Sequence, residues 1–195
     1  MKNLRVMFGV LVMAVLALLW AGCAKPPVAE MDAAESAVIR AENDSDAVNF
    51  AGSSLARARE ALNRMREEAS SKRYDAAKNY AAEAVAAANK AISDGRAASA
   101  RAREEAGALL ATVRDSLEET GQAINNAKGV ENIDLDFNAV DQDFNAAQRA
   151  ADQAEVSLAG NKYQDSMEKS RTARGILGDI SSQIAGATVA VSRKK

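Results

Sequence analysis

The sequence predicts an all-α protein: an elongated antiparallel helical bundle with coiled-coil-like, alanine-rich heptad seams. Alanine is abundant, and Glu, Arg, Lys and Gln, which lose little side-chain entropy in a helix, fill the polar positions. Only 2 of the 195 residues are proline, and aromatic residues make up 4%. From Ala47 onward, small or apolar residues recur at intervals of four and three, which places a stripe along one side of a helix.

These stripes and the polar breaks between them predict five helices joined by short connections. The break Asn43–Asp46 separates the first two helices, and Ser45 or Asp46 can cap the second. Short connections make neighbouring helices antiparallel. The predicted helices are Glu30–Glu42, a second from Ala47 to the break at 70–73, a long third from Ala77 to Ala127, Ile133–Leu158 and Tyr163–Val191.

Two glycines, Gly95 and Gly107, lie inside the long third helix. Each costs about 1 kcal/mol relative to alanine in a helix interior. They are interpreted as points of close helix approach, as a hinge, or as glycines that the helix tolerates.

The chain also contains two similar helix–turn–helix layouts. When Ser54–Ala84 is laid on Asp143–Ala173 without gaps, Tyr74 falls on Tyr163, and each half has a polar break followed by "KRYDAA" or "NKYQDS". Helix–turn–helix pairs of this kind recur in repeat proteins such as the tetratricopeptide class. Internal duplication and convergence on a common heptad pattern both explain the layout.

The composition argues against several classes of chemistry. The chain has no histidine, the commonest general base and metal ligand, and a single cysteine cannot form a disulfide, a Cys/His zinc site or a Cys–His dyad. We therefore expect no enzyme activity, no cofactor and no metal. The net charge of -2 does not suggest a nucleic-acid partner.

Three polar features have a structural and a functional interpretation. Asp134–Phe144 has acids at alternate positions like a calcium loop, but an EF-hand needs Gly and Glu where this chain has Ala139 and Asn145, so a helix-capping turn is predicted. The Arg- and Glu-rich segments 57–68 and 101–106 predict intrahelical ion pairs, or alternatively a protein-docking face. Tyr74 and Tyr163 are expected to fix helix starts against the bundle, and ligand binding is the alternative.

The first 23 residues have the shape of an export signal. Lys2 and Arg5 precede the uncharged run Val6–Trp20. A transmembrane anchor is the alternative, although Val6–Gly22 is at the lower edge of the length that spans a bilayer.

Ala21-Gly22-Cys23 resembles the lipobox of bacterial lipoproteins, with Trp20 where that family usually has Leu. The resemblance implies cleavage before Cys23, which would carry a diacylglyceryl thioether and an N-linked acyl chain such as palmitate. Two or more acyl chains hold a protein stably on a membrane. The expected organisation is a cleaved signal peptide (1–22), the lipidated cysteine and a tether (23–29), an alanine-rich helical domain (30–128), a C-terminal helical hairpin (129–192) and a basic tail (193–195).

The stretch Ala33–Gly95 resembles a domain of unknown function found in bacterial envelope lipoproteins. The features that carry this are "SLARAREAL", the polar turn, "RYDAAKNYAAEA" and the alanine ladder after it. In that family the domain is helical and often precedes an OmpA-like peptidoglycan-binding domain, whose strands are not predicted in residues 129–195. The resemblance implies a helical scaffold of the cell envelope and no activity.

In outline, the chain also resembles the murein lipoprotein family, with a lipidated cysteine, heptad helices and a terminal lysine. By that resemblance, Lys195 would be joined covalently to peptidoglycan. We expect a non-catalytic lipoprotein, held at the outer membrane through lipid on Cys23 and facing the periplasm, that offers a helical surface to envelope proteins. A peptidoglycan tether through Lys195 is the alternative, and exposed seams can also drive formation of a homo-oligomer.

Overall fold

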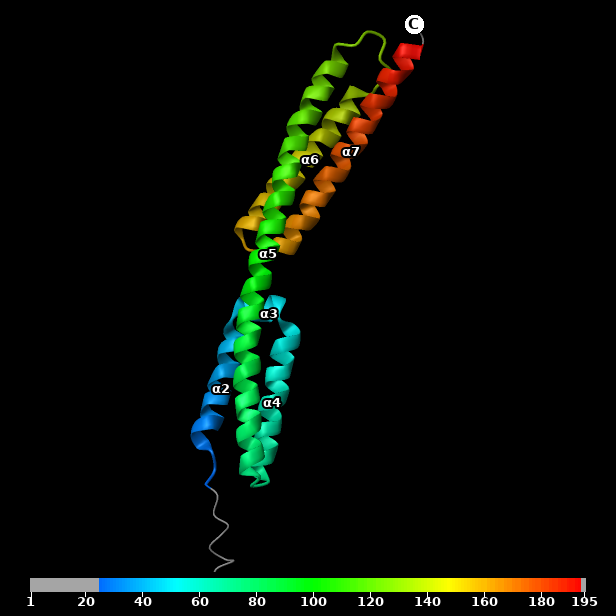
Figure 1. The fold of residues 1–195 in the computed structure, drawn as a ribbon. Coiled ribbons are helices and arrows are strands. Elements are labelled where there is room, and N and C mark those ends of the chain that lie inside the picture. Colours follow the sequence, from blue (N-terminus) through cyan, green and yellow to red (C-terminus); the bar gives the residue numbers. More distant parts are fainter. Residues whose placement is uncertain (1–24, 194–195) are drawn as a thin grey trace, which may run out of the picture. The chain divides into compact units, whose positions relative to one another are not determined.

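The computed structural model describes residues 25–193, and within them it confirms the predicted all-α class (Figure 1). Within these residues it contains six helices and no strand. The helices are α2 (Val28–Asn43), α3 (Ser45–Phe50), α4 (Gly52–Ser70), α5 (Tyr74–Lys128), α6 (Phe137–Ala159) and α7 (Tyr163–Arg193).

The chain divides into two compact units, the first ending at Arg96 and the second starting at Ala97. Helix α5 contributes residues to both units, because it runs unbroken from Tyr74 to Lys128. The division into residues 30–128 and 129–192 that the sequence suggests stays a prediction.

In the first unit, α2, α3, α4 and the first part of α5 share one core that consists mostly of alanine. The larger side chains in it are Val38, Leu55, Leu62 and Met65, each no more than 7% exposed. Small side chains let helix backbones approach closely, but each removes little apolar surface from water. Burial of apolar surface stabilises a fold by about 25 cal/mol per Å², so each alanine contributes little. Stability in this unit therefore comes from many small contacts along the helices.

In the second unit, the last part of α5 packs with α6 and α7 around larger side chains. Leu110, Val113 and Leu177 belong to one cluster, and Ile124 and Ile180 belong to a second. The apolar stripe that the sequence predicts along the last helix, from Tyr163 to Val191, is confirmed as its buried face as far as Ile184. Its buried members are Tyr163, Ser166, Ser170, Ala173, Leu177, Ile180 and Ile184. Its last two members, Ala187 and Val191, are half-buried. The hydroxyls of Ser166 and Ser170 have no hydrogen-bond partner among the described residues.

The second predicted helix is interrupted, which corrects the sequence-based prediction of one helix from Ala47. The backbone leaves the helical conformation at Ala51, with φ -128° and ψ 36°. Glycine and serine are poor helix formers, and they follow Ala51 as Gly52-Ser53-Ser54. The cap of α3 is Asp44, not Ser45 or Asp46, because the Ala47 backbone N–H donates to Asp44 Oδ1 at 2.9 Å.

The fourth predicted helix begins later than its apolar stripe. Ile133 and Leu135 lie in the connection after α5, where they pack against the cluster that contains Ile184. Asp136 Oδ1 accepts hydrogen bonds from the backbone N–H groups of Asn138 and Ala139, at 3.0 and 3.2 Å. Helix α6 therefore starts at Phe137, and the predicted helix-capping acidic turn is confirmed.

The turns before α5 and α7 have the same backbone pattern. Lys72 and Asn161 both adopt a left-handed conformation, with φ 58° and φ 59°. The N–H groups of Arg73 and Lys162, the next residues, each donate to a carbonyl five residues back, at 2.9 and 2.8 Å. These positions correspond in the gapless overlay of the two halves, although internal duplication stays a prediction.

The structure distinguishes Gly95 from Gly107, two of the three glycines of α5. A Cβ atom on Gly95 would lie 2.6 Å from the backbone of Asp46 and Ala47, so Gly95 is a point of close approach between α3 and α5. A Cβ atom on Gly107 would meet nothing within 4 Å. Glycine is required by packing only at the first of these positions.

Candidate interaction surface

The two residues predicted from sequence as attachment points, Cys23 and Lys195, both lie outside the described residues. The described chain begins with Lys25 and Pro26, which are exposed, and Pro27 directly precedes α2. At the other end, Ser192 and Arg193 are exposed in the last turn of α7.

The described helices do not supply a membrane span or a metal site. None of those within residues 25–193 is both long and apolar enough to cross a bilayer. In the same residues, no three His, Cys, Asp or Glu side chains gather closely enough to hold a metal ion. Asp141, which belongs to the acidic segment 134–144, pairs with Lys128 at the end of α5. Its two carboxylate oxygens lie 3.0 and 2.9 Å from Lys128 Nζ.

A serine and a lysine meet in the second unit, at the turn between α6 and α7. Lys169 Nζ lies 2.9 Å from Ser157 Oγ and 2.8 Å from Asp165 Oδ2. A lysine that activates a serine must be a neutral amine, whereas this one forms an ion pair with a carboxylate. The hydrogen bonds from Lys169 and Ser157 lower the pKa of Asp165. The cluster therefore connects α6 and α7 through side-chain hydrogen bonds.

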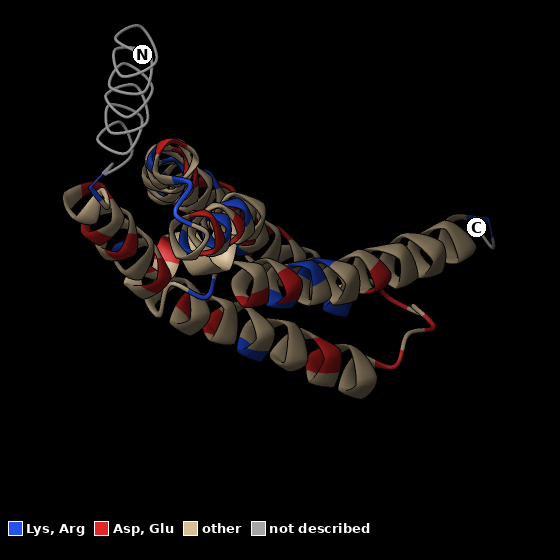
Figure 2. Ribbon diagram, turned by 90° about the horizontal axis from the view of Figure 1, so that it is seen from below, with Lys and Arg blue, Asp and Glu red and all other residues tan. Residues whose placement is uncertain are grey.

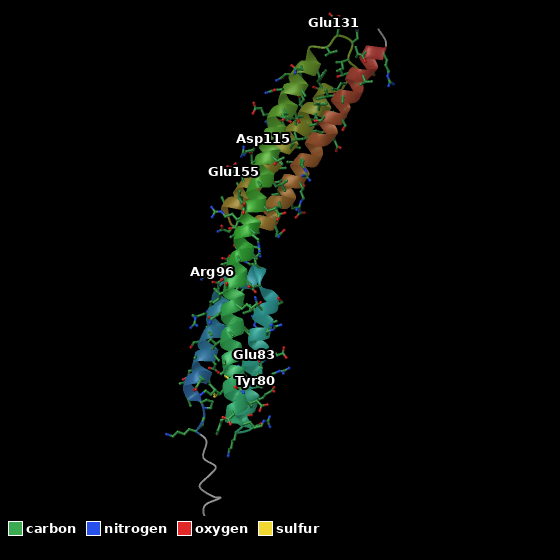
Figure 3. The ribbon with its side chains drawn as sticks, in the orientation of Figure 1. Tyr80, Glu83, Arg96, Asp115, Glu131 and Glu155 are labelled. Carbon is green, nitrogen blue, oxygen red and sulfur yellow. The ribbon has the colours of Figure 1, made fainter. Side chains whose placement is uncertain are left out.

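The arginine-rich segment of α4 forms pairs both within the helix and between helices. Arg64 Nη2 lies 2.6 Å from Glu60 Oε1 within α4, as the sequence predicts. Arg64 also lies above the ring of Tyr80, 5.9 Å from its centroid, and Figure 3 marks Tyr80 on α5. Both positive and negative residues occur on the described helices (Figure 2).

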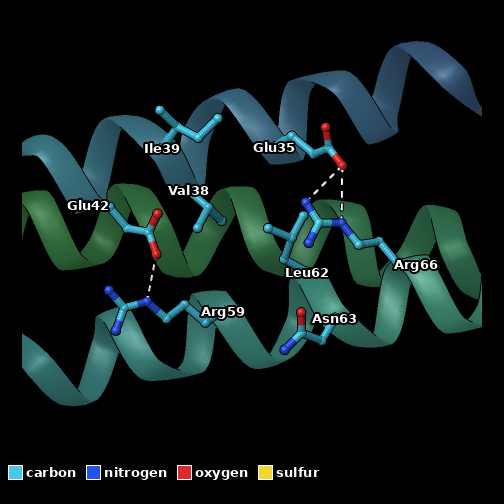
Figure 4. A pocket seen from close by; sticks show the side chains of 8 residues that line it. All are labelled: Glu35, Val38, Ile39, Glu42, Arg59, Leu62, Asn63 and Arg66. Atoms are coloured by element: carbon cyan, nitrogen blue, oxygen red, sulfur yellow. Dashed lines mark hydrogen bonds and ion pairs between the residues drawn. The ribbon is translucent and has the colours of Figure 1, made fainter.

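Two further arginines of α4 reach α2, which the sequence-based prediction missed (Figure 4). Arg59 Nε donates to Glu42 Oε1 at 2.6 Å, and Arg66 donates to Glu35 Oε1 from Nε at 3.1 Å and from Nη2 at 3.0 Å. We call these two pairs the α2–α4 ladder. The available sequence signal was spacing: the two glutamates are seven residues apart, and so are the two arginines.

The ladder borders a groove between α2 and α4. Its apolar residues are Val38, Ile39 and Leu62, and Asn63 adds an amide. Val38 and Leu62 are buried, but Ile39 is 55% exposed. Ile39 is thus an exposed apolar side chain between two ion pairs. An apolar centre with a polar rim is typical of protein interaction surfaces.

Other ion pairs connect the start of the first unit to α5. Lys78 Nζ lies 3.0 Å from Glu30 Oε1, and the hydrogen bond from Lys78 lowers the pKa of Glu30. Arg96 Nη2 lies 3.2 Å from Asp44 Oδ2. The pKa of Asp44 is lowered first by the hydrogen bond from the Ala47 backbone and then by Arg96. These contacts fix α2 and the start of α3 against α5.

Comparison with known families finds one match, in the first part of the described chain. Residues 29–107 match the family model described as "Domain of unknown function (DUF4398)". The match confirms a domain of unknown function over the region whose motifs suggested one, and it covers α2, α3, α4 and α5 as far as Gly107. No curated protein and no solved structure matches the chain.

Proposed function

We propose that this protein is a lipid-anchored, non-catalytic lipoprotein that presents a helical interaction surface in the bacterial cell envelope, at the outer membrane facing the periplasm. The observation that carries the proposal is the position of Cys23. It follows an uncharged run and two small residues, and it stands just ahead of the domain of unknown function that begins at residue 29. A helical body directly after a lipidation motif is the arrangement of a surface protein held by acyl chains.

The polar side chains of the described units support an interaction role. The Ser157–Asp165–Lys169 cluster connects helices, and the α2–α4 ladder borders an exposed isoleucine. The expected partners are the membrane, through lipid, and envelope proteins, through the helical surface.

Metabolic labelling with palmitate and detergent partitioning test the anchor. The wild-type chain is expected to take up label and enter the detergent phase, whereas Cys23→Ala should remain unlabelled and unprocessed. Ser53→Ala, an exposed serine near the start of α4, is the matched control and should label like wild type. Equal labelling of wild type and Cys23→Ala would refute lipidation.

A peptidoglycan tether through Lys195 is the alternative, and one observation favours it. After Ile184, the last core residue of α7, the helix continues to Arg193 with Val189 48% exposed. The helix thus presents its final turns to solvent. Mass spectrometry of muropeptides is expected to find a fragment linked to Lys195, which Lys195→Arg abolishes. Absence of that fragment from wild-type cells would exclude the covalent tether.

A further inference from the structure

The α2–α4 groove has a charge pattern that matches its own copy. We propose that it pairs with the same groove of a second copy of this chain, so that the two first units lie parallel. This pairing rests on the proposed scaffold function and names one partner for the helical surface. It does not depend on lipid at Cys23, because a chain without lipid would pair in the same way.

The ladder retains unused hydrogen-bonding capacity for such a partner. Glu35 and Glu42 each accept through Oε1, and among the described residues neither Oε2 accepts a hydrogen bond. A guanidinium has five N–H donors, of which Arg59 uses one and Arg66 uses two. The side chains are also accessible: Arg59 is 55% exposed and Arg66 is 53% exposed.

Symmetry then selects one orientation. The glutamates lie on α2 and the arginines on α4, and the antiparallel pairing sets Glu35 beside Arg66 and Glu42 beside Arg59 (Figure 4). A two-fold axis parallel to the helices places α2 of one copy on α4 of the other, so each glutamate meets an arginine. An axis across the helices places α2 on α2, where glutamate meets glutamate and arginine meets arginine. Only the parallel pairing makes favourable charge contacts.

The apolar residues fit the same orientation. In the parallel pair, Ile39 of each copy lies opposite Leu62 and Asn63 of the other, in the part of the groove that the ladder leaves open. One exposed isoleucine with charged edges is a small contact, so the pairing is expected to be weak in dilute solution. The test must therefore detect pairing at high local concentration.

Cysteine cross-linking in bacterial cells tests the pairing on the full chain. One copy carries Ile39→Cys and one epitope tag, and a co-expressed copy carries Asn63→Cys and a second tag. A short bismaleimide reagent is expected to join the two tags, with the 39–63 peptide identified by mass spectrometry. Val156→Cys, which is 73% exposed on α6, measures random collision. The chain without an added cysteine measures any contribution of Cys23.

A charge-swapped chain separates pairing from folding. Glu35→Arg, Glu42→Arg, Arg59→Glu and Arg66→Glu together restore the ladder within one chain, so the variant should retain wild-type helicity. It should form 39–63 cross-links with itself as wild type does, whereas its 39–63 cross-linking to wild-type chains should fall to the collision level.

Three results would overturn the proposal. The first is 39–63 cross-linking no greater than that of the Val156→Cys control. The second is the formation of 39–39 links in place of 39–63 links. The third is 39–63 cross-linking between swapped and wild-type chains that equals the cross-linking of swapped chains to each other. Links from these cysteines to a different protein would assign the groove to that partner instead.

Discussion

At the residue scale, whether a position tolerates substitution depends on the atoms that surround its side chain. Gly95 and Gly107 occupy the same helix and look alike in the sequence. Packing distinguishes them, since only Gly95 faces the backbone of another helix within van der Waals distance. A sequence pattern can mark such glycines, but it cannot show which one supports a helix contact.

Replacing these two glycines by alanine should therefore change stability in opposite directions. Gly95→Ala places a methyl group 2.6 Å from backbone atoms, which cannot move aside as a side chain can, and we expect a loss of about 1–3 kcal/mol. Gly107→Ala has open space and a better helix former, so we expect a gain of up to about 1 kcal/mol. Urea unfolding followed by circular dichroism measures both changes. A Gly95→Ala midpoint at or above that of wild type would contradict the close approach.

Asp44 is a second position at which one side chain supports a helix end. Asp44→Ala removes the cap of α3 and should cost about 1 kcal/mol at neutral pH, whereas Asp44→Asn, which also caps well, should stay closer to wild type. The folded pKa of Asp44 lies below the ordinary 3.8, so its carboxylate stabilises the fold above that value. The difference in stability between wild type and Asp44→Ala should narrow as the pH falls below 3.8 and then through the lower folded pKa, because Asp44 becomes protonated in the folded state. Thermal melts across this pH range measure the gap, and a constant gap would argue against a role for the ionised carboxylate.

At the element scale, the helices that were predicted best are those whose buried face is a single uninterrupted stripe. The stripe on α7 is confirmed residue by residue down to Ile184. The break at Ala51 was missed, because the apolar interval continues across it while the backbone turns. The ladder partners were missed because they depend on the antiparallel register of α2 and α4, which the sequence of one helix does not contain.

Helix α7 contains two buried serines that its packing does not need. Ser166 and Ser170 are 0% exposed, and their hydroxyls lack partners within the described residues. A buried, unsatisfied polar group costs about 1–3 kcal/mol, so Ser166→Ala and Ser170→Ala should each raise the stability of the second unit by about 1 kcal/mol. Ser157→Ala is the control, because it removes contacts with Asp165 and Lys169 and should lower stability. Chemical unfolding measures all three, and a loss on either of the first two substitutions would show that the hydroxyl has a partner.

At the scale of the whole molecule, the fold class followed from composition and period, but the division into units did not. Alanine-rich stripes with few aromatic residues leave no solution other than packed helices. The division between Arg96 and Ala97 falls inside the continuous helix α5, directly after the polar run Ser93-Asp94-Gly95-Arg96, which does not interrupt the helix. It arises because the buried residues of the first core end at Ala91 and the next core cluster begins at Leu110.

Because the two units have separate cores, we expect a core substitution to reduce protection from amide hydrogen exchange only in its own unit. Met65→Ala empties space in the first core and Leu177→Ala in the second, and each should cost about 2–5 kcal/mol. Since no residue belongs to both cores, Met65→Ala should speed amide hydrogen exchange in α2 and α4 while leaving α6 and α7 near wild type, and Leu177→Ala should do the reverse. Hydrogen–deuterium exchange with mass spectrometry, on the full chain under native conditions, resolves the two sets of peptides. If either substitution increased exchange equally in all of these helices, the two units would unfold as one cooperative body.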